Sequence, residues 1–235
     1  MSIYMWREHI PQELCFTANS AGSIVRLQKT GSPTAVTLET STDGNTRTTY
    51  TIWDTITLNN IWDKVYFRNT SETDTLFSVS GSSYYQFYMS WSISASGDIN
   101  YLLNKNSTST LSYYCYYMLF EWCTNLITVP NLPATTLAAN CYGTMFEWCT
   151  NLTTLPELPA TTLADYCYNA MFYWCSKIKL SATQTWAYQT PYRIPITWTW
   201  TTANYALSSM FTSTWWTFTW TPSINTTYYT SNTLV

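Results

Sequence analysis

Residues 115–182 consist of three consecutive segments that match one another: CYYMLFEWCTNLITVPNLPATTLAAN (115–140), CYGTMFEWCTNLTTLPELPATTLADY (141–166) and CYNAMFYWCSKIKLSA (167–182). More than half of the positions are identical between the first two copies, and the period is 26 residues. A fixed period of this length is typical of leucine-rich solenoids, in which each coil buries its apolar face only against its neighbours. We therefore predict a short solenoid of three 26-residue coils over residues 106–182.

Six cysteines repeat with this period in two columns, namely Cys115, Cys141 and Cys167, and Cys123, Cys149 and Cys175. The columns are eight residues apart, which is not the C-x₂₋₄-C spacing of a zinc site. Identical residues stacked along a solenoid normally form part of its core, where Cys behaves as a small buried hydrophobe. We expect a structural ladder of buried thiols and no metal, with disulfides or metal ligation as the alternative.

Aromatic residues form further columns. Three tryptophans lie in one of them and three tyrosines flank it: Trp122, Trp148, Trp174, Tyr116, Tyr142 and Tyr168. Exposed aromatic planes would suit stacking on the apolar C–H faces of sugar rings, because an aromatic ring presents a large, flat apolar surface. We predict a candidate glycan-binding face here. The alternative is that the rings pack on each other or on a subunit.

Two carboxylates, Glu121 and Glu147, also share a column. Adjacent coils lie about 4.8 Å apart, and a carboxylate pair about 5 Å apart is the arrangement of a retaining glycosidase. Every same-column pair in a solenoid has this spacing, however, and the third coil carries Tyr173 instead. A solvated acidic face is therefore favoured, no catalytic residue is predicted, and a glycoside hydrolase is the remote alternative.

Residues 11–105 show short alternating patterns separated by turn residues, which is typical of an antiparallel β-sandwich. The clearest run has one parity shared by Phe87, Met89, Trp91 and Ile93. Asp43-Gly44 is the strongest hairpin signal. We predict seven or eight half-buried strands, preceded by an N-terminal tail at residues 1–10, and we expect residues 1 to about 105 to fold alone.

Residues 183–235 are predicted to form a β-rich C-terminal cap that the repeats require for stability. Arg193 is the single charged residue of this segment, and a large apolar surface so poor in charge usually marks an interface. The segment also contains Leu207–Phe211, which echoes the Met-Phe of the repeat. We expect assembly with other copies or other proteins through Trp198, Trp200, Trp215, Trp216 and Trp220.

Composition excludes several classes of protein. Charged residues make up 10% and aromatic residues 18% of the chain, unlike a disordered protein, and no apolar run reaches the length of a membrane-spanning helix. A net charge of −3 gives no basic surface for nucleic acid. Residues 1–10 lack the pattern of a secretory signal, so we expect no signal-dependent export.

Two parts of the repeat resemble the BspA-type leucine-rich repeat. Its A-F, C and L positions are similar to Met145-Phe146, Cys149 and Leu152, and its I-P and following apolar positions to Leu158-Pro159 and Leu163. The resemblance covers residues 115–180. Arrays of CYxxMFxxCTxLTTxPxLPATTLA behind a region ending ASGDINYLLNKNST are also similar to proteins of phages and prophages of gut Bacteroidales, including crAss-like phages. This second resemblance spans nearly the whole chain.

Together, these features predict a mainly β protein: a β-sandwich, a short leucine-rich-repeat-like solenoid and a β-rich cap. The resemblance implies a non-enzymatic virion structural or decoration protein, assembled in the bacterial cytoplasm, that needs no cofactor. Its expected partners are further copies of itself, other virion proteins and host surface glycans, with no nucleic acid and no membrane insertion. The alternative is a BspA-like adhesin on a bacterial cell surface.

Overall fold

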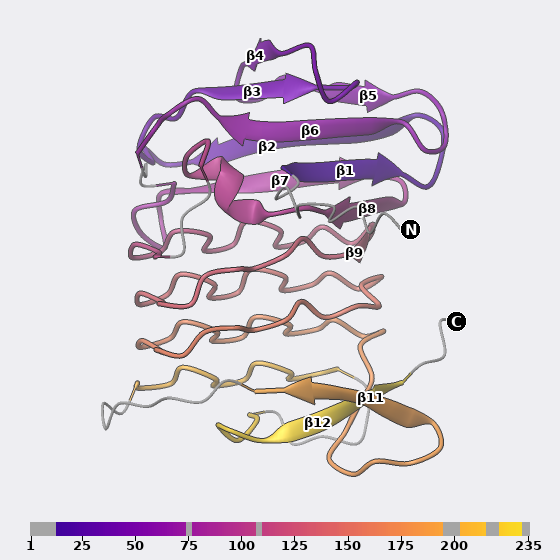
Figure 1. Cartoon of the computed structure of the whole chain (residues 1–235), viewed down its shortest axis with the longest axis vertical. Helices are drawn as coiled ribbons and strands as arrows, with labels where there is room; N and C mark the ends of the chain where they lie inside the picture. Colours follow the sequence, from indigo (N-terminus) through magenta and orange to yellow (C-terminus); the bar gives the residue numbers. More distant parts are fainter. Residues whose placement is uncertain (1–12, 74–76, 107–109, 195–202, 215–220, 232–235) are drawn as a thin grey trace, which may run out of the picture.

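The computed structural model describes residues 13–73, 77–106, 110–194, 203–214 and 221–231, and the chain is mainly β (Figure 1). The described elements are β1 (Leu14–Ala18), β2 (Ser23–Thr30), β3 (Leu38–Ser41), β4 (Thr48–Tyr50), β5 (Ile56–Leu58), β6 (Lys64–Asn69), β7 (Tyr84–Ser90), β8 (Ile93–Ser96), the 3-10 helix η1 (Ile99–Leu102), β9 (Leu126–Thr128), β10 (Leu180–Ser181), β11 (Tyr188–Arg193) and β12 (Thr227–Ser231). Within these ranges, no helix is long and apolar enough to cross a membrane.

Strands β1 to β8 form two sheets that pack against each other. One sheet has the order β4-β3-β6-β1-β8-β9 and the other β5-β2-β7. The ring of Phe87 on β7 contacts Phe16 on β1 and Phe67 on β6 across the two sheets, with ring centroids 4.8 and 5.5 Å apart. The Asp43-Gly44 hairpin is confirmed, because Gly44 has a φ of 80° between the paired strands β3 and β4.

The alternating run from Phe87 to Ile93 belongs to two strands. Its shared parity predicted one strand with a single buried face. β7 pairs with β2, whereas β8 pairs with β1 in the other sheet. Trp91 lies between them with a φ of 57° and is exposed. The chain changes sheet at this residue, so Trp91 leaves the core although Phe87, Met89 and Ile93 are buried.

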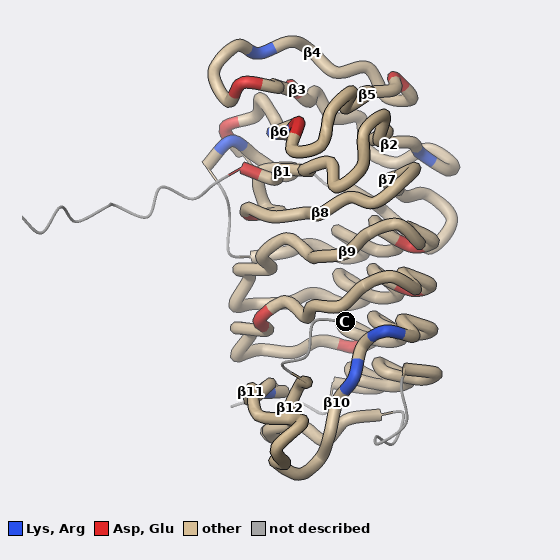
Figure 2. Tube along the Cα trace, turned by 90° about the vertical axis from the view of Figure 1, so that its right-hand side faces the viewer, with Lys and Arg blue, Asp and Glu red and all other residues tan. Residues whose placement is uncertain are grey.

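The three repeats stack along one axis below these sheets (Figures 1 and 2). Tyr116 N–H donates to the Cys141 carbonyl at 2.8 Å, and Tyr142 N–H donates to the Cys167 carbonyl at 3.0 Å. Equivalent bonds join Phe120 to Met145 and Phe146 to Met171. Each repeat therefore satisfies backbone groups of its neighbour, in register with the sequence period.

The segment that begins each repeat is a row of turns. Bonds between residues three apart, such as Leu119 N–H to the Tyr116 carbonyl, alternate with the bonds to the next repeat. Every fourth residue of the row has a positive φ, as at Tyr114, Met118 and Trp122, and the same holds in the following repeats. Left-handed backbone is uncommon for such residues, and here it recurs because the turns and the stacking bonds fix it in each copy.

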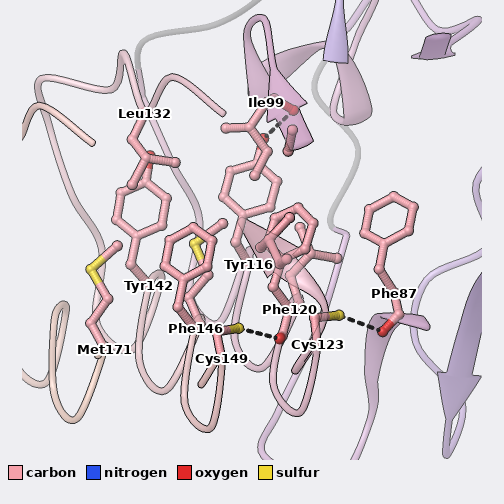
Figure 3. Close-up of a cluster of buried hydrophobic side chains, with 14 of the residues drawn as sticks. Phe87, Ile99, Tyr116, Phe120, Cys123, Leu132, Tyr142, Phe146, Cys149 and Met171 are labelled. Atoms are coloured by element: carbon pink, nitrogen blue, oxygen red, sulfur yellow. Dashed lines mark hydrogen bonds between the residues drawn. The ribbon is translucent and has the colours of Figure 1, made fainter. Parts of the chain in front are cut away.

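A single hydrophobic core runs through the sheets and the repeats. The rings of Phe87 and Phe120 are stacked at 5.3 Å, and the column continues at 5.3 Å to Phe146 (Figure 3). The next ring of the column, Phe172, lies 5.6 Å from Phe146. β9 of the first repeat also pairs in parallel with β8. The boundary predicted near residue 105 therefore does not interrupt the core.

The C-terminal segment adds a fourth turn row to the stack. Phe172 N–H donates to the Met210 carbonyl at 2.9 Å, and the rings of Phe172 and Phe211 are stacked at 5.3 Å. The sequence offset here is 39 residues rather than 26, as between Asp165 and Asn204. The extra residues form part of the sheet β10-β12-β11. Residues 195–202 and 215–220 of the predicted β-rich cap lie outside the described residues.

Candidate functional site

The tryptophan column lies on the turn rows and its rings are stacked on each other. Trp122 and Trp148 have ring centroids 4.7 Å apart at 6°, and Trp148 and Trp174 are 4.8 Å apart at 9°. Trp122 is 57% exposed and Trp174 39%. Both faces of Trp148 are covered, which differs from the expected column of open planes. Within the column, only Trp122 and Trp174 have one ring face that no neighbouring tryptophan covers. The edges of the three indole rings line the surface.

The tyrosine column does not belong to this surface. Tyr116, Tyr142 and Tyr168 are all buried, with parallel rings 5.7 Å apart. The Tyr116 hydroxyl bonds the Ile99 carbonyl at 3.2 Å and Asn100 Oδ1 at 3.0 Å. The expectation that these tyrosines contribute to a ligand face is therefore wrong, because the turn row directs them into the core.

The glutamate column lies beside the tryptophans. Burial, and then the neighbouring Glu147 carboxylate, raise the pKa of Glu121 to about 7, against an opposing hydrogen bond from Trp122. Burial also raises the pKa of Glu147, opposed by a hydrogen bond from Trp148. Each carboxylate is thus half-buried beside an indole N–H rather than fully solvated, which refines the predicted solvated acidic face.

The sheet β5-β2-β7 continues this surface toward the N-terminus. The Gln86 side chain on β7 donates to the Glu121 carbonyl at 2.9 Å. The guanidinium of Arg26 lies 4.6 Å from the ring centre of Tyr88 and 5.8 Å from that of Trp53, within the range of cation–π attraction. Sequence analysis did not single out these residues.

The sequence pattern did not identify Trp62 and Trp91 as candidate surface residues, although they are 73% and 64% exposed. Trp62 follows the Asn59-Asn60 turn, and its φ of 74° marks a left-handed turn position. The available signal was a large aromatic residue directly beside turn residues, where a core position is improbable. The predicted assembly residues Trp198, Trp200, Trp215, Trp216 and Trp220 lie outside the described residues.

The cysteine columns lie in the core. All seven cysteines are buried thiols in the described residues, and none is joined to another by a disulfide. Cys123 and Cys149 direct their sulfurs at the carbonyl oxygens of Phe87 and Phe120, both at 3.1 Å (Figure 3). Cys175 makes the equivalent contact with the Phe146 carbonyl oxygen at 3.0 Å. Among the described residues, no cluster of metal-ligating side chains is found.

These thiols should resist alkylation in the native protein. Burial raises the pKa of Cys167 to about 12 and the pKa of Cys149 well above its usual value, so little thiolate forms at pH 8. We expect mass spectrometry to find almost no label after native iodoacetamide treatment. After denaturation without reductant, all seven cysteines should be labelled. If full labelling of the denatured protein requires prior reduction, disulfides are present and the thiol ladder is contradicted.

Stability should depend on pH through Glu121. Its folded-state pKa of about 7 lies above the usual 4.5, so the folded protein binds more protons than the unfolded chain between these values. The free energy of unfolding therefore falls as pH rises from about 4.5 to about 7, by roughly 1–2 kcal/mol after allowance for solvent screening. Denaturant titrations across this range should show the decrease in the wild type and a smaller one in Glu121→Gln.

Glu157→Gln is the matched control, because it removes an exposed carboxylate of the second repeat. We expect this variant to retain the pH dependence of the wild type. Equal pH dependence in Glu121→Gln and the wild type would rule out Glu121 as its source.

Comparisons of this chain with protein-family models, with curated proteins and with solved structures found no match in any of the three.

Proposed function

We propose that this chain is a non-enzymatic structural or decoration protein of a bacteriophage particle that binds host-surface glycans. In this proposal, residues 11–105 are a β-sandwich, residues 106–182 are a short solenoid of leucine-rich-repeat type and residues 183–235 are its cap. The supporting observation is the unbroken phenylalanine column from Phe87 to Phe211, which makes the sheets and the repeats one packed body. Side chains held rigidly on such a body lose little conformational entropy on binding.

Glycan is the ligand that best fits the chemistry of the surface. The outer face of Trp122 offers an apolar plane, and the adjacent Glu121 and Gln86 offer hydrogen-bonding groups. Sugars present both apolar C–H faces and hydroxyl groups, so one ring can use both kinds of contact. Ligand sites commonly combine aromatic surface with a few polar groups in this way.

The rival assignment, a glycoside hydrolase, is less well supported by the glutamate pair. A retaining enzyme needs environments that move the two pKa values apart, so that one carboxyl donates a proton while the other is ionised. Here burial raises the pKa of both Glu121 and Glu147. Both shifts are in the same direction, whereas an acid and nucleophile pair needs one carboxyl with a raised pKa and one that stays ionised.

Assembly is assigned to the C-terminal half. Residues 106–235 contain few charges, and the predicted contact residues Trp198, Trp200, Trp215, Trp216 and Trp220 are concentrated there. Such an aromatic composition fits burial against further copies of this chain or against other virion proteins. The C-terminal half then attaches to the particle.

Immunogold electron microscopy of purified phage particles, with antibodies against this chain, tests the location. We expect regular labelling of one structure on the particle, and the same antibodies should block adsorption to host cells. Labelling of the bacterial envelope in cells free of phage would instead support an adhesin and overturn the virion assignment.

A further inference from the structure

Trp62 and Trp91 extend the exposed tryptophans of the repeats onto the N-terminal sheets. Trp62, Trp91 and Trp122 are 73%, 64% and 57% exposed, and all three have a positive φ. Trp62 and Trp91 each stand two residues before a strand, β6 and β8, and Trp122 stands four residues before β9. Three separate turns therefore present a tryptophan in the same backbone conformation.

Strand pairing brings these turns to one edge of the molecule. Trp62 N–H donates to the Ala18 carbonyl at 2.8 Å, and the next residue, Asn19, donates its N–H to the Ser92 carbonyl at 2.9 Å. Ile93 N–H in turn donates to the Asn125 carbonyl at 3.1 Å. The starts of β6, β8 and β9, with the end of β1 between the first two, lie on the right-hand edge in Figure 1.

The spacing along this edge follows from the sheet. β6 and β8 lie on either side of β1, so their starts are about 10 Å apart, twice the strand spacing. β9 is the next neighbour of β8 and adds about 5 Å. The turns that carry the three tryptophans therefore follow one another across the strand direction, along the axis on which the repeats stack, and one sugar ring could not span the distance between the starts of β6 and β8.

The surroundings of the row are polar and nearly uncharged. Asn19 lies between Trp62 and Trp91, and its side chain donates to Ser94 Oγ at 2.9 Å. Figure 2, which looks onto this edge, shows an uncharged tube through β8 and β9. Few charged residues stand next to these tryptophans in the sequence: Asp63 and Lys64 follow Trp62, and the half-buried Glu121 precedes Trp122.

We propose that the edge row Trp62, Trp91 and Trp122 binds an extended, neutral polysaccharide chain that runs along the stacking axis. The inference rests on the proposed glycan-binding function and extends its site from Trp122, at the end of the self-stacked column, to the two exposed rings outside the column. Among the described residues, no aromatic ring contacts Trp62 or Trp91, so their planes are open to sugar rings. The low charge of the edge favours a neutral polymer, because an acidic one would need cationic side chains along its length.

Native affinity electrophoresis in gels containing mannan, dextran, laminarin, alginate or heparin tests this site. We expect the full chain to be retarded by at least one of the three neutral polysaccharides and to a smaller degree by the two acidic ones. With oligosaccharides of the retarding polymer, affinity should rise with length until all three rings are covered. Stronger retardation by alginate or heparin would overturn the neutral-polymer assignment.

The double variant Trp62→Asn/Trp91→Asn is the decisive comparison. Asn tolerates left-handed backbone better than Trp, so the variant should retain the circular dichroism spectrum and melting temperature of the wild type. Its affinity for the retarding polymer should fall by about 30-fold or more, as expected for the loss of two aromatic contacts. Trp186→Asn, a control at an exposed tryptophan on the β10–β11 connection, should bind like the wild type.

The outcomes separate the two proposals. Failure of the wild type to bind any of the polysaccharides would count against the glycan-binding function itself. If the wild type and the double variant bind with equal affinity, the glycan-binding function is supported and the edge row is overturned. If the wild type sediments as an oligomer and the double variant as a monomer, the row is a contact between copies and the polysaccharide site is rejected.

Discussion

Deletion of residues 141–166 should yield a folded protein that is one repeat shorter. The deletion joins Asn140 to Cys167 and removes one full period of 26 residues. Every column then remains continuous, because Phe120 can stack on Phe172. The Cys175 sulfur can bond the Phe120 carbonyl in place of the Phe146 carbonyl. Because repeat stability is a sum over repeats and their interfaces, we expect cooperative unfolding at a lower denaturant midpoint.

Deletion of residues 141–153 provides the matched control, because it removes half of the period. Thr154 would then follow Asn140, so the inward positions of one copy would face the outward positions of the next. We expect this shorter deletion to lose cooperative unfolding and near-UV circular dichroism, although it removes fewer residues. Equal folding of the two variants would show that the register of the columns does not hold the stack together.

The sequence period predicts which residues are neighbours but not which of them face inward. The columns of Phe, Cys, Trp and Tyr follow directly from the 26-residue repeat. Which columns face the core and which face the surface depends on the local backbone, which the period does not specify. In the row of turns, pairs of residues alternate instead: Cys141-Tyr142 and Met145-Phe146 are buried, whereas Glu147-Trp148 are partly exposed.

Because of this pattern of four, Tyr142 is buried although its column flanks the tryptophans in the sequence. A row of turns has neither the helical period of 3.6 nor the strand period of 2, so the usual periodicity arguments do not apply to it. The other feature of the row, a left-handed residue at every fourth position, cannot be recognised from the sequence either. Those positions hold Tyr, Met, Trp, Asn, Thr or Ala in the three repeats, with no Gly.

The fourth turn row is a second feature that periodicity could suggest only in part. Leu207–Phe211 echoes the repeat, and the structure stacks Phe211 on Phe172. The offset of 39 residues comes from an insertion after the third repeat that includes β11. A fixed period cannot locate a copy displaced by an insertion, which is why the segment was predicted as a cap of different structure.

Phe120→Ala should destabilise the N-terminal sheets and the repeats together. Phe120 is fully buried and stacks on Phe87 of β7 and on Phe146 of the next repeat. Removal of a buried Phe ring typically costs about 3–5 kcal/mol, a large part of the total stability of a domain. Because the core is continuous across residue 105, we expect one unfolding transition with a much lower midpoint.

Hydrogen exchange followed by mass spectrometry can locate this loss of stability. In Phe120→Ala, peptides from β1 and β6 and peptides from the second repeat should lose protection by similar factors, since both contact the same phenylalanine column. Phe172→Ala is the control within the column, because Phe172 contacts Phe146 and Phe211 and lies two repeats from β7. If β1 and β6 keep full protection in Phe120→Ala while the repeats lose theirs, residues 1–105 fold alone as the sequence suggested. Parallel loss would instead show that the sheets serve as the N-terminal cap of the stack, with stability passed through the rings of Phe87 and Phe120.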